Sequence, residues 1–215
     1  MNGLFPRARQ DIAPGAVHVP DWLPLPGQLA LVEACREWAK APAGLREVLT
    51  PGGGRMSARQ FGLGRHWTPR GYTRTAVDGD GAPVKPMPHR LADLARRAVA
   101  ATGFGAADGC AYDVALINYY DDAAHMGMHQ DRDEQTDAPV VSLSLGDSCT
   151  FRFGNTETRT KPYNDVELQS GDLFVFGGPS RLAFHGVPRI HAGTAPPELG
   201  LSGRLNITLR VSGLG

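Results

Sequence analysis

The stretch ALINYYDDAAHMGMHQDRDE, residues 115–134, contains an apolar run followed by a short acidic loop. His129 and Asp131 are two residues apart within it, so their side chains point the same way if the backbone is extended. His185 lies in a second apolar, strand-like segment and is the candidate for a third ligand. Two imidazoles and one carboxylate on one face of an octahedron suit Fe(II) and leave positions open for oxidation chemistry.

The acidic character of this loop has a second interpretation. Six acidic residues and one arginine lie between positions 121 and 137. Runs of like charge are commonly solvated surfaces, and a His-x-Asp triplet alone is a weak signal for a metal. Taken alone, the loop therefore allows either a metal site or an exposed acidic surface.

The segment RLNITLRV, residues 204–211, alternates strictly between apolar and polar side chains, which predicts a half-buried strand. Arg204 and Arg210 lie on its polar face, with Asn206 between them. Six residues of strand separate the two arginines by ~20 Å. Because arginine binds carboxylates through a planar fork of donors, such a pair indicates a diacid ligand. Two arginines that protect an edge strand from aggregation are the alternative.

In this order, the motifs Asn118-Tyr119-Tyr120, His129-Gln130-Asp131, His185 and RLNITLR resemble the AlkB family of Fe(II)- and 2-oxoglutarate-dependent nucleic-acid dealkylases. The resemblance covers most of the chain and extends to TPGG at 50–53, Trp67, Gly71-Tyr72, Asp133-Glu134, VSLSLG at 141–146 and GGPSR at 177–181. The chain departs from the bacterial pattern at Tyr119, Phe176 and Arg74, and none of these is an expected iron ligand.

The resemblance implies an α+β, mainly β fold. A double-stranded β-helix, a variant of the jelly roll, would carry N-terminal helices and a nucleotide-recognition lid. Residues 1–108 would form the N-terminal extension with the helices and the lid. Residues 109–215 would form the Fe(II)/2-oxoglutarate jelly-roll core, and the two parts would be integrated in one domain.

The resemblance also assigns roles to individual residues. Fe(II) would be held by His129, Asp131 and His185, which are the catalytic group. The cosubstrate 2-oxoglutarate would be bound by Asn118, Tyr120, Arg204, Asn206 and Arg210. The methylated base and its backbone would be contacted by Trp67, Tyr72, Arg74, Asp133, Glu134 and Arg159.

The implied reaction is oxidative demethylation with O2, Fe(II) and 2-oxoglutarate, which is converted to succinate. N1-methyladenine and N3-methylcytosine in single- or double-stranded DNA would be the substrates, with RNA left open. Both bases are cationic, so the acidic loop would favour them, and a base in a duplex must be flipped out. Two other functions stay open: a 2-oxoglutarate oxygenase that hydroxylates a protein or small molecule, and a non-catalytic metal-binding jelly roll.

The composition agrees with a globular protein. The 215 residues have zero formal net charge, 41% hydrophobic and 20% charged residues, which suits one domain. No signal-like or membrane-spanning apolar segment is evident, so we expect a cytoplasmic monomer with no membrane partner. Three scattered cysteines predict reduced thiols. Residues 55–97 contain nine basic and three acidic residues, an excess consistent with phosphate contacts.

Periodicity predicts helices over residues 28–40 and 88–102, both bracing a sheet. Residues 51–88, rich in Gly, Pro and Arg, predict an irregular or hairpin-containing surface element. Short strands are predicted over residues 112–119, 140–145, 150–153, 165–168, 173–176, 182–187 and 205–211, which favours a sandwich or barrel.

Overall fold

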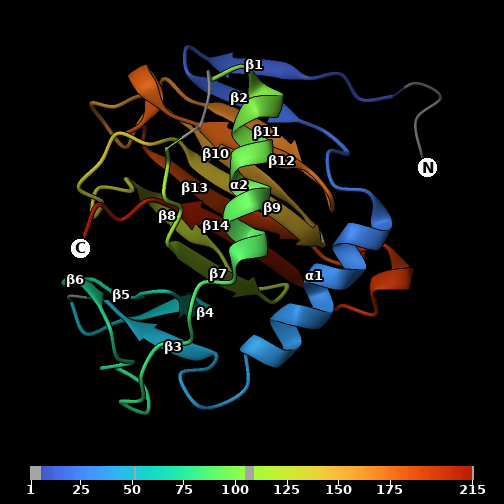
Figure 1. The fold of residues 1–215 in the computed structure, drawn as a ribbon. Helices are drawn as coiled ribbons and strands as arrows, with labels where there is room; N and C mark the ends of the chain where they lie inside the picture. The colour runs from blue at the N-terminus through green and yellow to red at the C-terminus, as the bar shows by residue number, and fades with distance from the viewer. Residues whose placement is uncertain (1–5, 51, 105–108, 215) are drawn as a thin grey trace.

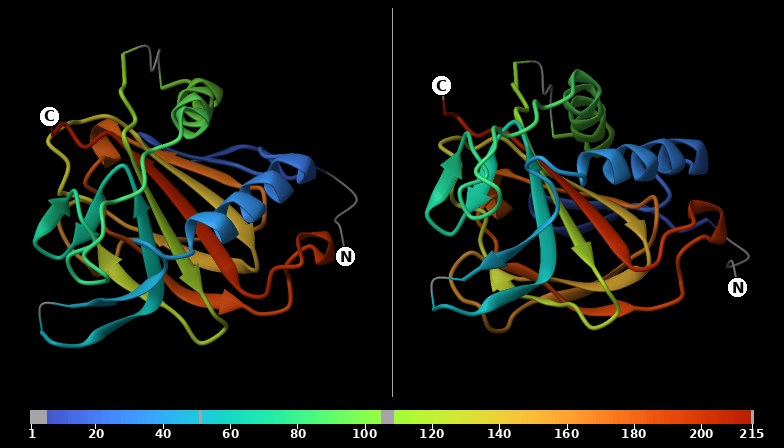
Figure 2. Two further views of the ribbon diagram at one scale, coloured as in Figure 1. Left: turned by 60° about the horizontal axis from the view of Figure 1, so that its bottom comes forward. Right: turned by 90° about the horizontal axis from the view of Figure 1, so that it is seen from below.

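The structure, a computed structural model, describes residues 6–50, 52–104 and 109–214 of the chain. These residues are arranged in three layers: two helices, a large antiparallel sheet and a smaller antiparallel sheet (Figure 1). Figure 2 shows both helices on one face of the large sheet and the smaller sheet across its other face. The two facing sheets form the jelly roll that the resemblance implied, with the α+β, mainly β class.

The large sheet has the spatial order β1-β2-β12-β9-β14-β7-β4-β3. Its strands are β1 Gln10–Ala13, β2 Ala16–Val19, β3 Arg46–Leu49, β4 Arg55–Leu63, β7 Val114–Tyr120, β9 Val140–Gly146, β12 Leu173–Phe176 and β14 Arg204–Arg210. Strand β14 lies in the interior of this sheet and pairs antiparallel with both β7 and β9. Its polar side chains are therefore fixed in position from two sides.

The smaller sheet has the order β11-β10-β13-β8. Its strands are β8 Met126–His129, β10 Ser148–Phe153, β11 Asn164–Leu168 and β13 His185–His191. A separate hairpin pairs β5 His66–Thr68 with β6 Gly71–Thr73. Two short 3-10 helices, η1 Gly178–Ser180 and η2 Pro197–Leu199, complete the described elements.

Apolar side chains on the outer face of the large sheet pack against the helices α1 Leu25–Trp38 and α2 His89–Thr102. In α2, Leu91, Leu94, Ala95 and Ala98 form a buried stripe of helical spacing, and the helix ends at Gly103 with φ +73°. These side chains meet the odd-numbered residues of β14, including Ile207. Burying each such side chain contributes about 1.5–3 kcal/mol, which keeps this face of β14 turned outward.

The inner face of the large sheet encloses a second core. Phe151 and Phe153 of β10 pack edge-on or tilted against Phe174 and Phe176 of β12. The ring of His185 packs onto the same group, with its centroid 5.0 Å from that of Phe176. This aromatic cluster forms an apolar bed beneath the site described below.

Several sequence predictions are confirmed, with small differences in bounds. Both helices form, as do all seven strands predicted after residue 109, although the strand predicted over 182–187 begins later, at His185. Cys35, Cys110 and Cys149 are free thiols. None of the helices in the described ranges is long and apolar enough to cross a membrane.

The prediction for residues 51–88 was partly wrong. The expected hairpin is present as β5–β6, but Arg55–Leu63 forms a full strand, β4, inside the large sheet. Its pattern was hidden because the inward side holds small or polar residues such as Ala58 and Gln60, while Phe61 and Leu63 face the helices. The large sheet thus contains strands from both sides of the boundary expected after residue 108. That boundary adjoins residues 105–108, which lie outside the described ranges.

Asp172 ties the N-terminal segment to the sheet. Its fully buried carboxylate accepts both guanidinium nitrogens of Arg7 at 2.8 and 2.6 Å and Nε2 of His18 at 2.9 Å. It also accepts the backbone N–H groups of Asp21 and Gln169. Burial opposes its ionisation, but these hydrogen bonds outweigh burial and hold the pKa of Asp172 below its usual range.

We therefore predict that Asp172→Asn lowers the free energy of unfolding by about 3 kcal/mol at neutral pH, because Arg7 and His18 lose a buried partner. Because the pKa of Asp172 is lower in the folded state, its ionised carboxylate stabilises the fold at pH values above the unfolded pKa of about 3.9. This stabilisation is lost as the pH falls through the folded-state pKa. Urea denaturation of both proteins should show the difference narrowing below pH ~4. An equal difference at all pH values would contradict this role.

Candidate active site

The register of the smaller sheet brings two histidines together. His129 ends β8 and His185 begins β13, and the two residues are directly paired across the strands. Their ring centroids lie 4.4 Å apart. Asp131 follows two residues after His129, and one ligand atom from each of the three residues lies within 4.8 Å of the others. The predicted grouping of all three side chains is confirmed.

Backbone hydrogen bonds orient both imidazoles. Nδ1 of His129 lies 3.0 Å from the carbonyl oxygen of Gly127, and Nδ1 of His185 lies 3.0 Å from that of Ala183. With the proton on Nδ1, each Nε2 carries the lone pair and faces Asp131, at 3.7 and 3.6 Å from its carboxylate oxygens. Such a second hydrogen bond fixes the tautomer in metal-ligating histidines.

The protonation states also suit a cation. Burial opposes the ionisation of Asp131, but Arg210 and then the two histidines lower its pKa to about 2. Burial, assisted by the neighbouring His129, lowers the pKa of His185 to about 4. At neutral pH the site therefore offers a carboxylate and a neutral imidazole, which are the forms that bind metals.

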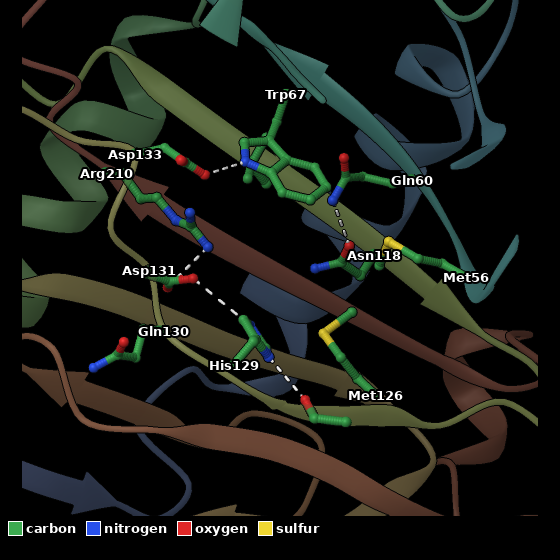
Figure 3. A pocket seen from close by; sticks show the side chains of 12 residues that line it. Met56, Gln60, Trp67, Asn118, Met126, His129, Gln130, Asp131, Asp133 and Arg210 are labelled. Atoms are coloured by element: carbon green, nitrogen blue, oxygen red, sulfur yellow. Dashed lines mark hydrogen bonds and ion pairs between the residues drawn. The ribbon is translucent and has the colours of Figure 1, made fainter. Parts of the chain in front are cut away.

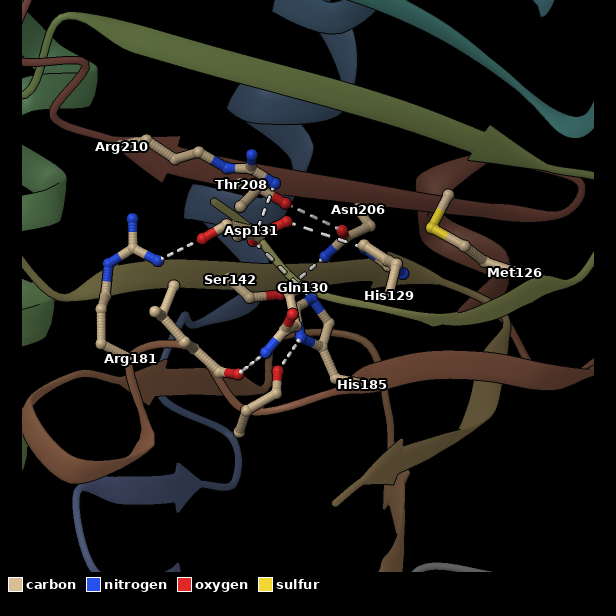
Figure 4. Close-up of polar contacts among 12 residues, drawn as sticks. Met126, His129, Gln130, Asp131, Ser142, Arg181, His185, Asn206, Thr208 and Arg210 are labelled. Carbon is tan, nitrogen blue, oxygen red and sulfur yellow. Dashed lines mark hydrogen bonds and ion pairs between the residues drawn. The ribbon is translucent and has the colours of Figure 1, made fainter. Parts of the chain in front are cut away.

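A buried ion network holds Asp131 in place (Figure 4). Nη2 of Arg210 lies 2.8 Å from Oδ2 of Asp131, and Nη1 lies 3.0 Å from Oε1 of Glu134. Arg181 binds Glu134 Oε2 at 2.9 Å and donates to the backbone oxygens of Asp131 and Ala138. The loop after β8 is therefore fastened at several points before any metal binds.

The polar face of β14 points into the jelly roll, as predicted. Arg204 is only 1% exposed, and its Nη2 donates to Ser144 Oγ at 3.0 Å. Among the described residues, its Nε and Nη1 have no hydrogen-bond partner. Two buried guanidinium donors without acceptors fit a carboxylate, because leaving such donors unpaired is costly. Tyr120, paired with Arg204 across the strands, is equally buried, with its hydroxyl 3.6 Å from Met126 Sδ.

Asn118 and Asn206 are directly paired across β7 and β14 and line a small cavity of ≈ 40 Å³ beside the iron ligands. Asn206 donates to Ser142 Oγ at 2.8 Å and to the backbone oxygen of Leu143 at 3.1 Å. Its Oδ1 accepts from Thr208. Asn206 therefore braces the sheet in this arrangement, while Asn118 borders the space open to a ligand.

A second cavity of ≈ 220 Å³ opens above the iron ligands (Figure 3). Its lining includes Trp67, Asp133, His129 and Asp131. Trp67 Nε1 donates to Asp133 Oδ2 at 2.6 Å, so the hairpin and the metal loop meet across it. The structure thus brings together two residues predicted to grip the base, 66 positions apart in the sequence.

The other four predicted base contacts do not line this cavity. Tyr72 pairs with Trp67 across the hairpin, and its hydroxyl donates to Glu134. The side chain of Glu134 is itself fully buried, between Tyr72 and the two arginines. Arg74 is exposed after β6, and Arg159 is exposed with its guanidinium 5.8 Å from the ring of Phe184. Neither arginine lines the cavity.

Two further residues of the site received no role from the sequence. Arg181 was visible only as part of the GGPSR motif, and nothing in that motif indicated that it binds the metal loop. Gln60 lies on β4, the strand that the sequence did not reveal, and donates to Asn118 Oδ1 at 2.9 Å. A strand prediction for residues 55–63 would have been the signal needed to find it.

This geometry, a jelly roll with a His-x-Asp…His group and a buried arginine beside it, defines an Fe(II)- and 2-oxoglutarate-dependent dioxygenase. The model of the 2OG-Fe(II) oxygenase superfamily matches residues 15–210. His129, Asp131 and His185 are the iron-binding triad, and 2-oxoglutarate is the cosubstrate.

Individual relatives show to which family within this class of dioxygenases the chain belongs. An alpha-ketoglutarate-dependent dioxygenase AlkB homolog of Caulobacter vibrioides is 40% identical over 93% of this chain and 88% of its own length. The Escherichia coli dioxygenase AlkB is 37% identical over 78% of this chain and 77% of its own length. The chain therefore belongs to the AlkB family.

Plant relatives extend the comparison. The DNA N(6)-methyladenine demethylase ALKBH1D of Arabidopsis thaliana is 34% identical over 93% of this chain, which spans about half (50%) of that protein. The solved structure of OsALKBH1 matches with a TM-score of 0.85 at 32% identity, over 94% of this chain and 99% of that one. The expected jelly roll is thereby confirmed.

Replacing His129, Asp131 or His185 with Ala should abolish both Fe(II) retention and turnover, because each removes one of three protein ligands. Metal content after anaerobic dialysis and succinate release from 2-oxoglutarate would measure the two effects. Circular dichroism should remain native, since the four phenylalanines beneath the site are unchanged. Full activity in Asp131→Ala would refute the assignment.

We further predict that Arg210→Ala raises the 2-oxoglutarate concentration needed for half-maximal turnover and lowers the free energy of unfolding by about 3–5 kcal/mol. The variant leaves Asp131 and Glu134 with less positive charge in a buried network. Succinate release at increasing 2-oxoglutarate and chemical denaturation would measure both. An unchanged 2-oxoglutarate requirement would exclude Arg210 from the cosubstrate site.

Proposed function

We propose that the protein oxidatively removes methyl groups from cationic N-methylated bases, N1-methyladenine and N3-methylcytosine, in DNA. The observation that carries this proposal is the hydrogen bond between Trp67 and Asp133 across a cavity that reaches the iron ligands. An aromatic ring and a carboxylate thus border the space where a substrate must meet the metal. The products are formaldehyde, succinate and the unmodified base.

The cavity suits a single flipped base. A base within a duplex cannot reach an enclosed site, so it must be turned out or come from a single strand. Trp67 offers a ring on which a base can stack, a contact worth about 1–3 kcal/mol. Asp133 places a negative charge beside the ring, which attracts a cationic base more strongly than a neutral one.

The chain's own residues position the reactants. Bound iron and 2-oxoglutarate supply the oxidation of an N-methyl C–H bond. Arg204 offers two buried donors to one carboxylate of the cosubstrate, and Arg210 holds Asp131 in its ionised form. The indole of Trp67, hydrogen-bonded to Asp133, borders the cavity into which the base would enter.

Exposed arginines on the hairpin suit the polynucleotide backbone. Arg70 lies in the β5–β6 turn and Arg74 just after β6, and both are exposed. Such side chains neutralise phosphates without reading sequence. Several other members of the basic run between residues 55 and 97 serve the protein itself: Lys85, for example, donates to the backbone oxygens of Trp38, Lys40 and Pro42.

The names of two relatives favour a second candidate substrate, N6-methyladenine in DNA, because ALKBH1D and ALKBH1C of Arabidopsis are DNA N(6)-methyladenine demethylases. That base is neutral, so Asp133 gives it no electrostatic advantage. RNA is a third possibility, since the related abh1 of Schizosaccharomyces pombe is a tRNA demethylase. The charge on Asp133 favours cationic methylated bases over the neutral N6-methyladenine, in DNA and in RNA alike.

The direct test supplies Fe(II), 2-oxoglutarate and air to the protein together with matched oligonucleotides. One would carry N1-methyladenine, one N6-methyladenine and one no modification. Mass spectrometry should show loss of one methyl group from the first strand, dependent on 2-oxoglutarate and absent in His129→Ala. Preferred turnover of the N6-methyl strand would replace the proposed substrate.

Variants of the cavity separate base recognition from oxidation. We predict that Trp67→Ala and Asp133→Asn each reduce kcat/KM for the N1-methyladenine strand by about tenfold or more, through lost stacking or lost charge. Succinate release without nucleic acid should be nearly unchanged, since neither residue is an iron ligand. Equal loss of both activities would argue against a base-specific role. Succinate release with no methylated strand turned over would favour a protein or small-molecule substrate.

A further inference from the structure

A row of three amides crosses the large sheet from one cavity to the other. Gln60 of β4 is paired with Asn118 of β7, and Asn118 is paired with Asn206 of β14. Gln60 lines the ≈ 220 Å³ cavity beside Trp67, here called the base cavity. Asn206 lines the ≈ 40 Å³ cavity beside the metal ligands, here called the cosubstrate cavity, and Asn118 lines both. The orientation of the Asn118 amide therefore decides whether a donor or an acceptor faces the cosubstrate.

Asn206 has no N–H left to offer. Both hydrogens of its Nδ2 are engaged, by Ser142 Oγ and by the backbone oxygen of Leu143. Thr208 also donates to its Oδ1, so the amide is held at both ends. Within this row, a donor for a cosubstrate carboxylate must come from Asn118.

Within the described part of the chain, the Asn118 amide is held at one end only. Its Oδ1 accepts from Gln60 Nε2 at 2.9 Å. Figure 3 shows Nδ2 on the side of Asn118 away from Gln60, toward His129 and Asp131. An asparagine amide has two donors at nitrogen and an acceptor at oxygen, and the two ends differ little in size. In the observed arrangement the N–H of Gln60 meets the oxygen of Asn118, and the N–H groups of Asn118 face the iron side.

We propose that Gln60 is a positioning residue for 2-oxoglutarate, acting through Asn118. Gln60 lines the base cavity and not the ≈ 40 Å³ cavity beside the metal ligands. Its N–H holds Asn118 Oδ1 and thereby keeps Asn118 Nδ2 directed at the cosubstrate carboxylate. This inference rests on the proposed function, which requires 2-oxoglutarate, and on the cosubstrate contact that the resemblance implies for Asn118; it adds the residue that sets the orientation of that amide.

Gln60→Met tests the proposal, because it keeps the side-chain length and removes the donor. Calorimetric titration of 2-oxoglutarate into Mn(II)-loaded protein, without nucleic acid, reports binding rather than turnover. We expect about tenfold weaker 2-oxoglutarate affinity, as for one lost hydrogen bond to a charged group. The affinity for Mn(II) should be unchanged, since all three ligands remain. Unaltered 2-oxoglutarate affinity overturns the proposal.

Gln60→Glu provides an independent variant if Met perturbs folding. A carboxylate there accepts from Asn118 Nδ2, so Asn118 turns its oxygen toward the cosubstrate. We expect an affinity loss at least as large as in Gln60→Met, and wild-type affinity in this variant would also overturn the proposal.

Gln28→Leu is the matched control, because it removes another buried glutamine. Gln28 is hydrogen-bonded to Leu23 and Ser170, which lie far from the site along the chain. This variant should leave 2-oxoglutarate affinity unchanged.

A double-mutant cycle shows whether Gln60 acts through Asn118. Asn118→Ala should weaken 2-oxoglutarate binding, and adding Gln60→Met should then have no further effect. Additive losses would mean that Gln60 acts directly and would overturn the proposal. Unchanged affinity in Asn118→Ala would remove both the cosubstrate role of Asn118 and this inference. The demethylation proposal is measured on the methylated strand and would be unaffected by either result.

Discussion

The two-faced packing of β14 is the constraint on which the site depends. Its odd-numbered residues are buried against the helices, so a shift of one residue would place Leu205, Ile207 and Leu209 in the cavity. Pairing with β7 and β9 on both sides prevents that shift. The hydrophobic core therefore fixes where Arg204 and Arg210 point, and the apolar face of the strand positions the polar one.

A buried network of charged side chains also holds the site together. Arg210 lies between the iron ligand Asp131 and the buried Glu134, and Tyr72 of the hairpin donates to the same glutamate. The metal loop, the cosubstrate strand and the hairpin beside the base cavity are thus joined through a single carboxylate. A buried network of this kind is costly to break, because removing one member leaves the others unpaired. The site is consequently organised before its ligands bind.

Much of this arrangement could be predicted from the sequence. Clean alternation identified β14, and the spacing of His129 and Asp131 indicated a shared direction, because both patterns are local. His185 was a candidate ligand because it lies in a second strand-like segment, whereas the resemblance supplied Trp67. The partners of both residues lie far away in the sequence. The β8–β13 register that pairs His185 with His129 is not encoded in either segment alone.

Sequence reasoning missed Gln60 and Arg181, for different physical reasons. Strand β4 places Ala58 and Gln60 inward and Phe61 outward, so its alternation has no simple polar and apolar sides. Gln60 therefore gained a role only once its pairing with Asn118 was known. Arg181 and Glu134 carry charges that a solvated loop would also carry. Only their burial and mutual contact distinguish an internal network from an exposed acidic surface.

The most direct test is a crystal structure of the protein with Mn(II) and 2-oxoglutarate. A preorganised site predicts the metal between His129, Asp131 and His185, with one cosubstrate carboxylate on Nε and Nη1 of Arg204, two donors that have no hydrogen-bond partner among the described residues. The Arg210–Asp131 contact should persist. A cosubstrate bound elsewhere, with Arg204 still unpaired, would contradict it.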